Sequence, residues 1–122
     1  MTQTARQILG AQGETLAAEH YARLGFALVD RNYRTRAGEI DLVLSDGACT
    51  VFAEIKTRRT GGLDPALGFT AAKRRRMRAL AVAWLADHPQ RLRTDAVRID
   101  AVTVLLDPAG RLAVLEQFED VA

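Results

Sequence analysis

The sequence is poor in the residues from which several common sites are built. It has one cysteine, Cys49, and one serine, Ser45, and its two histidines, His20 and His88, lie far apart. One cysteine cannot form an internal disulfide, and one cysteine with two distant histidines does not make a structural zinc cluster. A single serine without an evident histidine partner argues against a serine hydrolase. Any chemistry must therefore be sought among the acidic and basic residues.

Long apolar runs are also missing. No stretch has the length and composition of a secretory signal or a membrane span, so we expect a soluble, cytoplasmic protein. Of the 122 residues, 48% are hydrophobic and 26% are charged, as in ordinary globular proteins. A chain of this length can bury roughly two-thirds of its unfolded surface without disulfides or metals. No repeat or long linker divides the sequence, so we expect one domain over residues 1–122.

Charge is unevenly distributed along the chain, although the net charge is only +2. Residues 56–93 contain ten lysines and arginines but two acids, whereas residues 94–122 contain two arginines and six acids. A basic centre favours interaction with a polyanion such as nucleic acid. An acidic protein partner would meet the same charges, so a protein-interaction module stays open as an alternative.

The most informative stretch is 38–56, which predicts an antiparallel hairpin. Apolar and polar residues alternate with period two on both sides of Asp46 and Gly47, a dipeptide suited to a tight turn. With a loop of two or four residues, four charged side chains share one face. These are Glu39, Asp41, Glu54 and Lys56. A four-residue loop places Asp41 directly opposite Glu54, whereas a three-residue loop would break the arrangement.

Three carboxylates on one face destabilise a sheet unless a cation or solvent relieves them. Mg²⁺ would do so, because it prefers oxygen ligands and commonly takes one or two carboxylates with water and phosphate. Asp41 and Glu54 fit this requirement. Lys56 could orient or deprotonate an attacking water, or balance the charge of a phosphate. The alternative is an amphipathic hairpin whose charged face is simply solvated.

A first helix is predicted from a Thr4 cap, with Gln7 in the capping-box position, to Gly25. Its apolar stripe includes Glu14. A carboxylate directed into a packed face needs a partner, which could be a backbone donor, an arginine or a metal. If the helix instead starts near Gly13, Glu14 is a favourable acid in the first turn.

A second helix is predicted over residues 70–87, and Lys73 falls within its apolar stripe. The same spacing directs Arg75, Arg76 and Arg78 away from that stripe. A lysine facing inward would serve a phosphate or a carboxylate, or would extend along the apolar surface to solvent. The preceding Gly61 and Gly62 predict a flexible connection.

Further strands are predicted at residues 26–33 and in a second hairpin, over residues 95–106 and 111–118, that turns at residues 107–110. Asp100 is expected as an ordinary acid on the polar face of its strand. The first of these strands leads into the carboxylate hairpin through a loop rich in arginine, where phosphate contact is possible.

The hairpin resembles the YraN-like family of small bacterial proteins. The resemblance rests on Gly38, Glu39, Ile40, Asp41 and Leu42, followed by Phe52, Ala53, Glu54, Ile55, Lys56, Thr57 and Arg58. It covers most of the chain. The matching positions outside the hairpin are Gly13, Glu14, Ala17, Gly25, Phe26, Arg31, Asn32, Tyr33, Lys73, Ile99 and Asp100.

That family is similar to PD-(D/E)xK nucleases, particularly archaeal Holliday junction resolvases. The resemblance implies an α/β restriction endonuclease-like fold, with a mixed β-sheet flanked by helices, and a phosphodiesterase that uses Mg²⁺ or Mn²⁺. The implied metal ligands are Asp41, Glu54 and the backbone carbonyl of Ile55. Lys56 would be the motif lysine. Glu14 would match the helix-borne acid of resolvase-like members, and Lys73 the polar residue on the helix after the motif.

We therefore predict an endonuclease that hydrolyses DNA phosphodiester bonds, with branched or structured DNA as its substrate. A non-catalytic nucleic-acid-binding module with the same fold is the alternative. A two-fold junction would suit a symmetric homodimer. Glu39 is predicted to be an auxiliary acid. The arginines predicted to contact the nucleic-acid backbone are Arg31, Arg34, Arg36, Arg58, Arg59 and Arg74.

Overall fold

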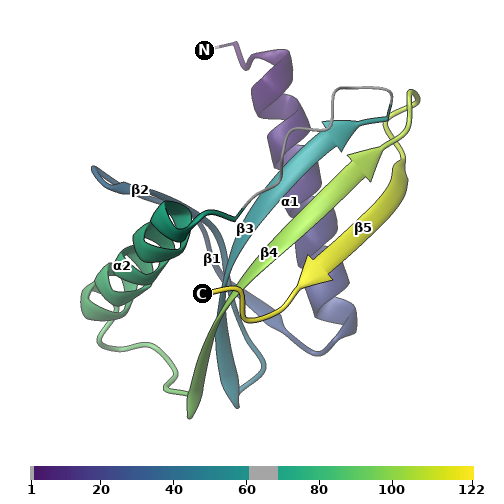
Figure 1. Cartoon of the computed structure of the whole chain (residues 1–122). Coiled ribbons are helices and arrows are strands. Elements are labelled where there is room, and N and C mark those ends of the chain that lie inside the picture. The colour runs from purple at the N-terminus through teal and green to yellow at the C-terminus, as the bar shows by residue number, and fades with distance from the viewer. Residues whose placement is uncertain (1, 61–68) are drawn as a thin grey trace.

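The computed structural model describes residues 2–60 and 69–122, in which two helices flank a sheet (Figure 1). The helices are α1 (Ala5–Arg23) and α2 (Ala71–Asp87), and the strands are β1 (Ala27–Thr35), β2 (Gly38–Ser45), β3 (Cys49–Arg59), β4 (Ala96–Leu106) and β5 (Leu112–Phe118). The strand order is β1-β2-β3-β4-β5. Strands β3 and β4 are parallel, and the other neighbours are antiparallel. This confirms the predicted α/β class, with a mixed sheet of the restriction endonuclease-like kind.

The two helices cover opposite faces of the sheet, because successive side chains of the central strands point to opposite sides. On β3, Val51 packs in the cluster that includes α1, whereas its neighbour Phe52 packs in the cluster that includes α2. Helix α1 contributes Ala17 and Tyr21 to its cluster. The α2 contribution consists of Met77, Leu80, Ala81 and Trp84. Both apolar stripes were predicted from helical spacing and are confirmed, except that Leu24, expected on the first stripe, follows α1 and is exposed.

The residue at which α1 begins determines whether Glu14 lies in the first turn of the helix or in its middle. The Thr4 hydroxyl accepts a hydrogen bond from the Gln7 backbone N–H at 3.1 Å, and the Gln7 side-chain carbonyl accepts one from the Thr4 N–H at 2.9 Å. This is the predicted capping box. The alternative start near Gly13 is wrong, and Glu14 is a mid-helix residue.

The loop between β2 and β3 has the four-residue length. Ser45 pairs with Thr50, and the paired register continues to Leu42 and Ala53. The carboxylate of Asp46 accepts hydrogen bonds from the backbone N–H groups of Ala48 and Cys49 at 2.9 and 2.8 Å, which closes the loop. The four-residue loop is therefore confirmed, but the pairing stops at Leu42 and Ala53, so the expected pairing of Asp41 with Glu54 is absent from the register of these two strands.

The other predicted elements are present with small shifts at their ends. Helix α2 begins after a Thr70 cap, and the second predicted hairpin is formed by β4 and β5. Strand β1 extends to Thr35, two residues beyond the expected end. The predicted connection through Gly61 and Gly62 lies outside the described residues.

Asp100 has a different role from the expected solvated acid, because it is completely buried. Its oxygens accept hydrogen bonds from the Tyr21 hydroxyl at 2.7 Å, from Arg98 Nε at 2.8 Å and Nη2 at 2.9 Å, and from Gln117 Nε2 at 3.1 Å. The Asp120 backbone N–H donates a further bond at 3.0 Å. Burial raises the pKa of the Tyr21 phenol, so Tyr21 stays a donor. This carboxylate ties α1 to β4, β5 and the residues after β5.

Helix α1 approaches β3 closely at Gly13, which is buried. A Cβ placed on Gly13 would lie 1.7 Å from the Thr57 hydroxyl oxygen and 2.7 Å from Thr57 Cβ, both far inside contact distance. The glycine is therefore required by packing, although its lack of a side chain weakens the helix. Its effect is to seat the middle of α1, including Glu14, against the sheet.

We predict that Gly13→Ala lowers the free energy of unfolding by about 1–3 kcal/mol, the usual cost of overpacking. Gly10→Ala is the matched control, because Gly10 lies in the same helix and an added Cβ there would meet no neighbour within 4 Å among the described residues. Removing that glycine should stabilise the protein by about 0.5–1 kcal/mol through better helix propensity. Urea unfolding of the two variants checks this, and equal effects would contradict the close approach.

Candidate functional site

Asp41 lies where the pairing of β2 and β3 ends. The last paired residues are Leu42 and Ala53. One residue further along β2, Asp41 Oδ2 accepts a hydrogen bond from the Ile55 backbone N–H at 2.7 Å. The Asp41 carboxylate thus accepts a hydrogen bond from a backbone N–H of β3 that lies beyond the last paired residues of β2 and β3. This bond fixes the position of the carboxylate relative to β3.

Three carboxylates converge at this point. One oxygen from each of Glu14, Glu39 and Asp41 lies within 4.8 Å of the others, and all three residues are half-buried. They come from different elements, because Glu14 belongs to α1 and the other two to β2. Glu39, predicted as an auxiliary acid, therefore lies among the clustered carboxylates. We call these three residues the carboxylate cluster.

Glu54 borders the cluster from β3. A hollow of about 200 Å³ is lined by Glu39, Asp41 and Glu54 together with residues of α2. The pairing of β3 with β4 has no register shift, so the side chains of β3 point alternately to the two faces of the sheet. Glu54 and Lys56 therefore share one face, and Ile55 points to the other. Lys56 is exposed and Glu54 is half-buried. The cluster thus lies between a hollow on the α2 side and α1 on the other side.

Two predicted nucleic-acid-binding arginines are paired with cluster acids. Arg31 Nε lies 3.3 Å from Glu14 Oε1, and its terminal nitrogens donate to the Thr15 hydroxyl and the Ala11 carbonyl. Arg34 Nε lies 2.9 Å from Glu39 Oε2, although its side chain is 75% exposed. Arg31 therefore holds Glu14 in place within the protein, whereas Arg34 lies at the surface.

Asn32 also contacts the carboxylate cluster, although the sequence named it only as a position that matches the family and gave it no role. With its amide oriented so that the nitrogen faces the carboxylates, it donates to Glu14 Oε1 at 3.3 Å and to Glu39 Oε1 at 3.0 Å. Its φ of 58° is in the left-handed region, which asparagine tolerates better than most residues. The strand pattern gave no signal of this turn in the backbone, and without it the amide would not be expected to reach both acids.

Helix α2 supplies positive charge to the hollow through Lys73 and Arg76. Lys73 is half-buried, in agreement with its place on the apolar stripe. Arg76 was expected to point away from the apolar stripe, and it is exposed, although it also borders the hollow. Its aliphatic chain lies against Gly38, where an added Cβ would be 3.2 Å from Arg76 Cδ. Helical spacing gives the direction of the Cβ only, and a long side chain can turn back along the surface.

The other predicted nucleic-acid-binding arginines lie outside the hollow. Arg36, Arg59 and Arg74 are exposed, and Arg58 is half-buried. Arg58 lies on the same face of β3 as Glu54 and Lys56, since it follows Lys56 by two residues.

The cluster perturbs the acidity of its members. Burial raises the pKa of Asp41 to about 7, the Ile55 N–H opposes this rise, and the charges of Glu14 and Glu39 add to it. Burial also raises the pKa of Glu14, against the influence of Arg31. Negative charge is therefore incompletely balanced within the protein, and a bound cation would relieve it.

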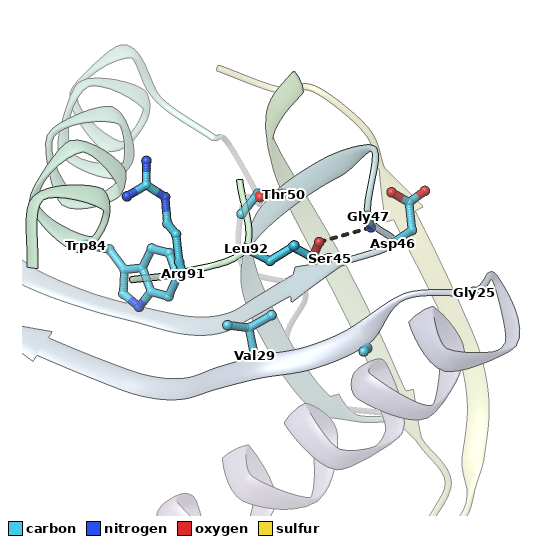
Figure 2. A pocket seen from close by; sticks show the side chains of 10 residues that line it. Gly25, Val29, Ser45, Asp46, Gly47, Thr50, Trp84, Arg91 and Leu92 are labelled. Carbon is cyan, nitrogen blue, oxygen red and sulfur yellow. Dashed lines mark hydrogen bonds between the residues drawn. The ribbon is translucent and has the colours of Figure 1, made fainter. Parts of the chain in front are cut away.

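A second hollow, of about 390 Å³, lies between β1, the β2–β3 loop and the segment after α2 (Figure 2). Trp84, Val29 and Leu92 give it an apolar lining. Its ionisable residues are Arg91 and Asp46, and Arg91 Nη1 donates to the carbonyls of Leu85 and His88 at 2.9 and 3.0 Å. No cluster of acids gathers in this hollow among the described residues.

Comparison with known proteins identifies the family. The model of the uncharacterised protein family UPF0102 matches residues 13–104. This chain belongs to the UPF0102 family. A UPF0102 protein of Corynebacterium efficiens is 44% identical over 97% of this chain and 94% of its own length, and one of Geobacter sulfurreducens is 41% identical over 87% and 84%. A UPF0102 protein of Rhodococcus jostii is 50% identical over 75% of this chain and 80% of its own. Membership confirms the resemblance to the YraN-like family.

Neither α1 nor α2 has the length and apolar character that crossing a membrane requires.

We predict that, without divalent cations, Asp41→Asn is more stable than wild type at about pH 8. This difference in the free energy of unfolding should be smaller at about pH 4.5. The raised pKa of Asp41 means that the folded state binds an extra proton between about pH 4 and about pH 7. Wild-type stability should therefore fall as the pH rises through that window, and the variant removes this loss. We expect a gain of about 1–2 kcal/mol at the higher pH, measured by urea unfolding.

Asp46→Asn is the control with the opposite sign. Hydrogen bonds from Cys49 and Ala48 lower the pKa of Asp46, so its carboxylate contributes stability above its ordinary pKa, and this is lost as the pH falls. Asp46→Asn should therefore lower stability at the higher pH. A wild-type pH profile parallel to that of Asp41→Asn would contradict the raised pKa.

Proposed function

We propose that this protein is an endonuclease that hydrolyses DNA phosphodiester bonds with Mg²⁺ or Mn²⁺, on branched or structured DNA. The observation that carries the proposal is the convergence of three carboxylates beside a hollow that Glu54, Lys73 and Arg76 also line. Such a site combines acidic ligands for a cation with positive side chains for a phosphate. The family membership and the restriction endonuclease-like fold support the same chemistry.

The residues present fit a hard divalent cation. Their donors are carboxylate oxygens, which Mg²⁺ and Mn²⁺ prefer, and burial, with the nearby charges of Glu14 and Glu39, raises the pKa of Asp41. Asp41 and Glu54 are the proposed ligands, with the Ile55 carbonyl as a third. The Ile55 N–H takes one acceptor position of Asp41 Oδ2 and leaves the other acceptor positions of this carboxylate for a cation. A cation bound there would polarise the phosphate and activate a water molecule.

The chain's own residues position the reactants around that cation. Glu14 is held by Arg31 and reaches the cluster from α1, where it can orient a water molecule. Lys56, on the same face as Glu54, can position the attacking water or stabilise negative charge that develops on the phosphate. Lys73 and Arg76 direct positive charge into the hollow from the opposite wall.

The surrounding arginines extend this charge beyond the hollow. Arg34, Arg36, Arg59 and Arg74 are exposed, as is suitable for contacts with the nucleic-acid backbone. Such contacts would strengthen association without selecting a base sequence, and they would weaken as salt concentration rises.

We predict that Asp41→Asn and Glu54→Gln each reduce metal-dependent cleavage at least about 100-fold, because each removes a charged ligand but keeps its shape. Lys56→Met should also reduce cleavage, because it removes the positive charge beside the proposed ligand Glu54. The assay uses labelled four-way junction, flap, duplex and single-stranded DNA with Mg²⁺, Mn²⁺ or a chelator. Glu19→Gln is the control, since Glu19 is an exposed acid of α1 outside the cluster.

Cleavage by wild type that a chelator abolishes, together with inactive site variants that remain folded, is the expected result. Equal cleavage by wild type and Glu54→Gln would contradict the assignment of the site. Metal-independent DNA binding without cleavage by any preparation would instead identify a binding module with a nuclease-like fold.

A further inference from the structure

Among the described residues, helix α2 covers only part of the length of the sheet face on which it packs. Helix α2 packs over Phe52 of β3 and its parallel neighbour Ile99 of β4. The next cross-strand row on this face is Glu54 on β3, Ala101 on β4 and Phe118 on β5. Paired residues point to the same side of a sheet, so these three side chains form a row beside the covered region. Phe118 is 45% exposed.

This row brings an exposed aromatic ring to the edge of the candidate site. Neighbouring strands are about 4.8 Å apart, so Phe118 lies roughly 10 Å across the sheet from the proposed ligand Glu54. The residue between them is alanine, whose small side chain leaves a shallow floor between the carboxylate and the ring. A separation of roughly this size is comparable to the reach of one or two nucleotides.

The adjacent rows supply the charge that a nucleic-acid strand needs. Lys56 aligns with Thr103 and Glu116, and Arg58 aligns with Leu105 in the row after that. Both cations are on β3, on the same side of the sheet as Glu54. Glu116 is the acid on β5, so positive charge is concentrated on the β3 side of this face. A strand would therefore keep its phosphates over β3 and direct its bases towards β5.

We propose that Phe118 is a stacking platform for an unpaired nucleobase adjacent to the phosphate held at the carboxylate cluster. The proposal rests on the proposed function and narrows its substrate to DNA that is single-stranded or has unpaired nucleotides at the site. A paired base in a duplex presents its edges and keeps its faces stacked on its neighbours, whereas an unpaired base has a face free for Phe118. Stacking of this kind accepts any base.

The test compares wild type with Phe118→Leu, which keeps an apolar side chain on β5 but removes the ring. Binding is measured by fluorescence anisotropy in Ca²⁺, with single-stranded DNA and with fully paired duplex. Phe118→Leu should bind single-stranded DNA roughly ten-fold more weakly and the duplex within about two-fold of wild type. Phe118→Tyr keeps an aromatic ring and should bind single-stranded DNA with the affinity of wild type. Leu112→Ala is the matched control, because Leu112 is an exposed apolar residue at the other end of β5.

A direct readout of stacking uses single-stranded DNA that carries 2-aminopurine. Wild type and Phe118→Tyr should quench its fluorescence at a position near the bound phosphate, and Phe118→Leu should not. Equal affinity and equal quenching by wild type and Phe118→Leu would overturn the platform while leaving metal-dependent cleavage, and thus the proposed function, intact. Absence of nucleic-acid binding by wild type would overturn both.

Sedimentation velocity on the same proteins tests the competing use of Phe118. If Phe118→Leu converts a wild-type dimer into a monomer and leaves DNA binding unchanged, the ring belongs to a contact between two copies and the platform is wrong. An unchanged sedimentation coefficient together with the loss of single-strand binding supports the platform.

Discussion

The hydrogen bond from the Ile55 N–H to the Asp41 carboxylate is the contact on which the site depends. It occurs where regular pairing between β2 and β3 ends, so a side chain takes over the role that a neighbouring strand has elsewhere. The bond fixes one carboxylate oxygen and leaves the other directed to its surroundings. It also brings Asp41 close to two further acids, and burial then makes their charge costly. The Asp41 carboxylate therefore has two roles. It accepts a backbone hydrogen bond from β3, and its charge is one that a cation would stabilise.

The second constraint is the set of partners that keeps these acids together without a cation. Arg31 and Asn32 contact Glu14, and Arg34 and Asn32 contact Glu39, so three consecutive elements of the fold meet at the cluster. These contacts do not cancel the effect of burial, because the pKa values of Asp41 and Glu14 remain raised. The arrangement is typical of functional sites, where groups are held in unfavourable surroundings by the rest of the structure.

Local patterns predicted the elements well because their causes are local. The Thr4 cap, the helical stripes and the turn at Asp46 each depend on residues close in sequence, and each is confirmed. Long-range contacts were less accessible. The burial of Asp100 depends on Tyr21 and Gln117, and the left-handed backbone of Asn32 has no periodic signature. The position of the Arg76 side chain beside the hollow was not predicted, because helical spacing does not describe the end of a long side chain.

The parallel pairing of β3 with β4 has a consequence for how the chain folds. Cys49 pairs with Ala96, so this contact closes a loop of 47 residues, whereas the β2–β3 and β4–β5 pairs are local hairpins. Loop-closure entropy makes distant pairing slower than local pairing. We expect the two hairpins to form early and to join late through the centre of the sheet. Asp41 and Glu54 would then be adjacent before the surface across β3, β4 and β5 exists.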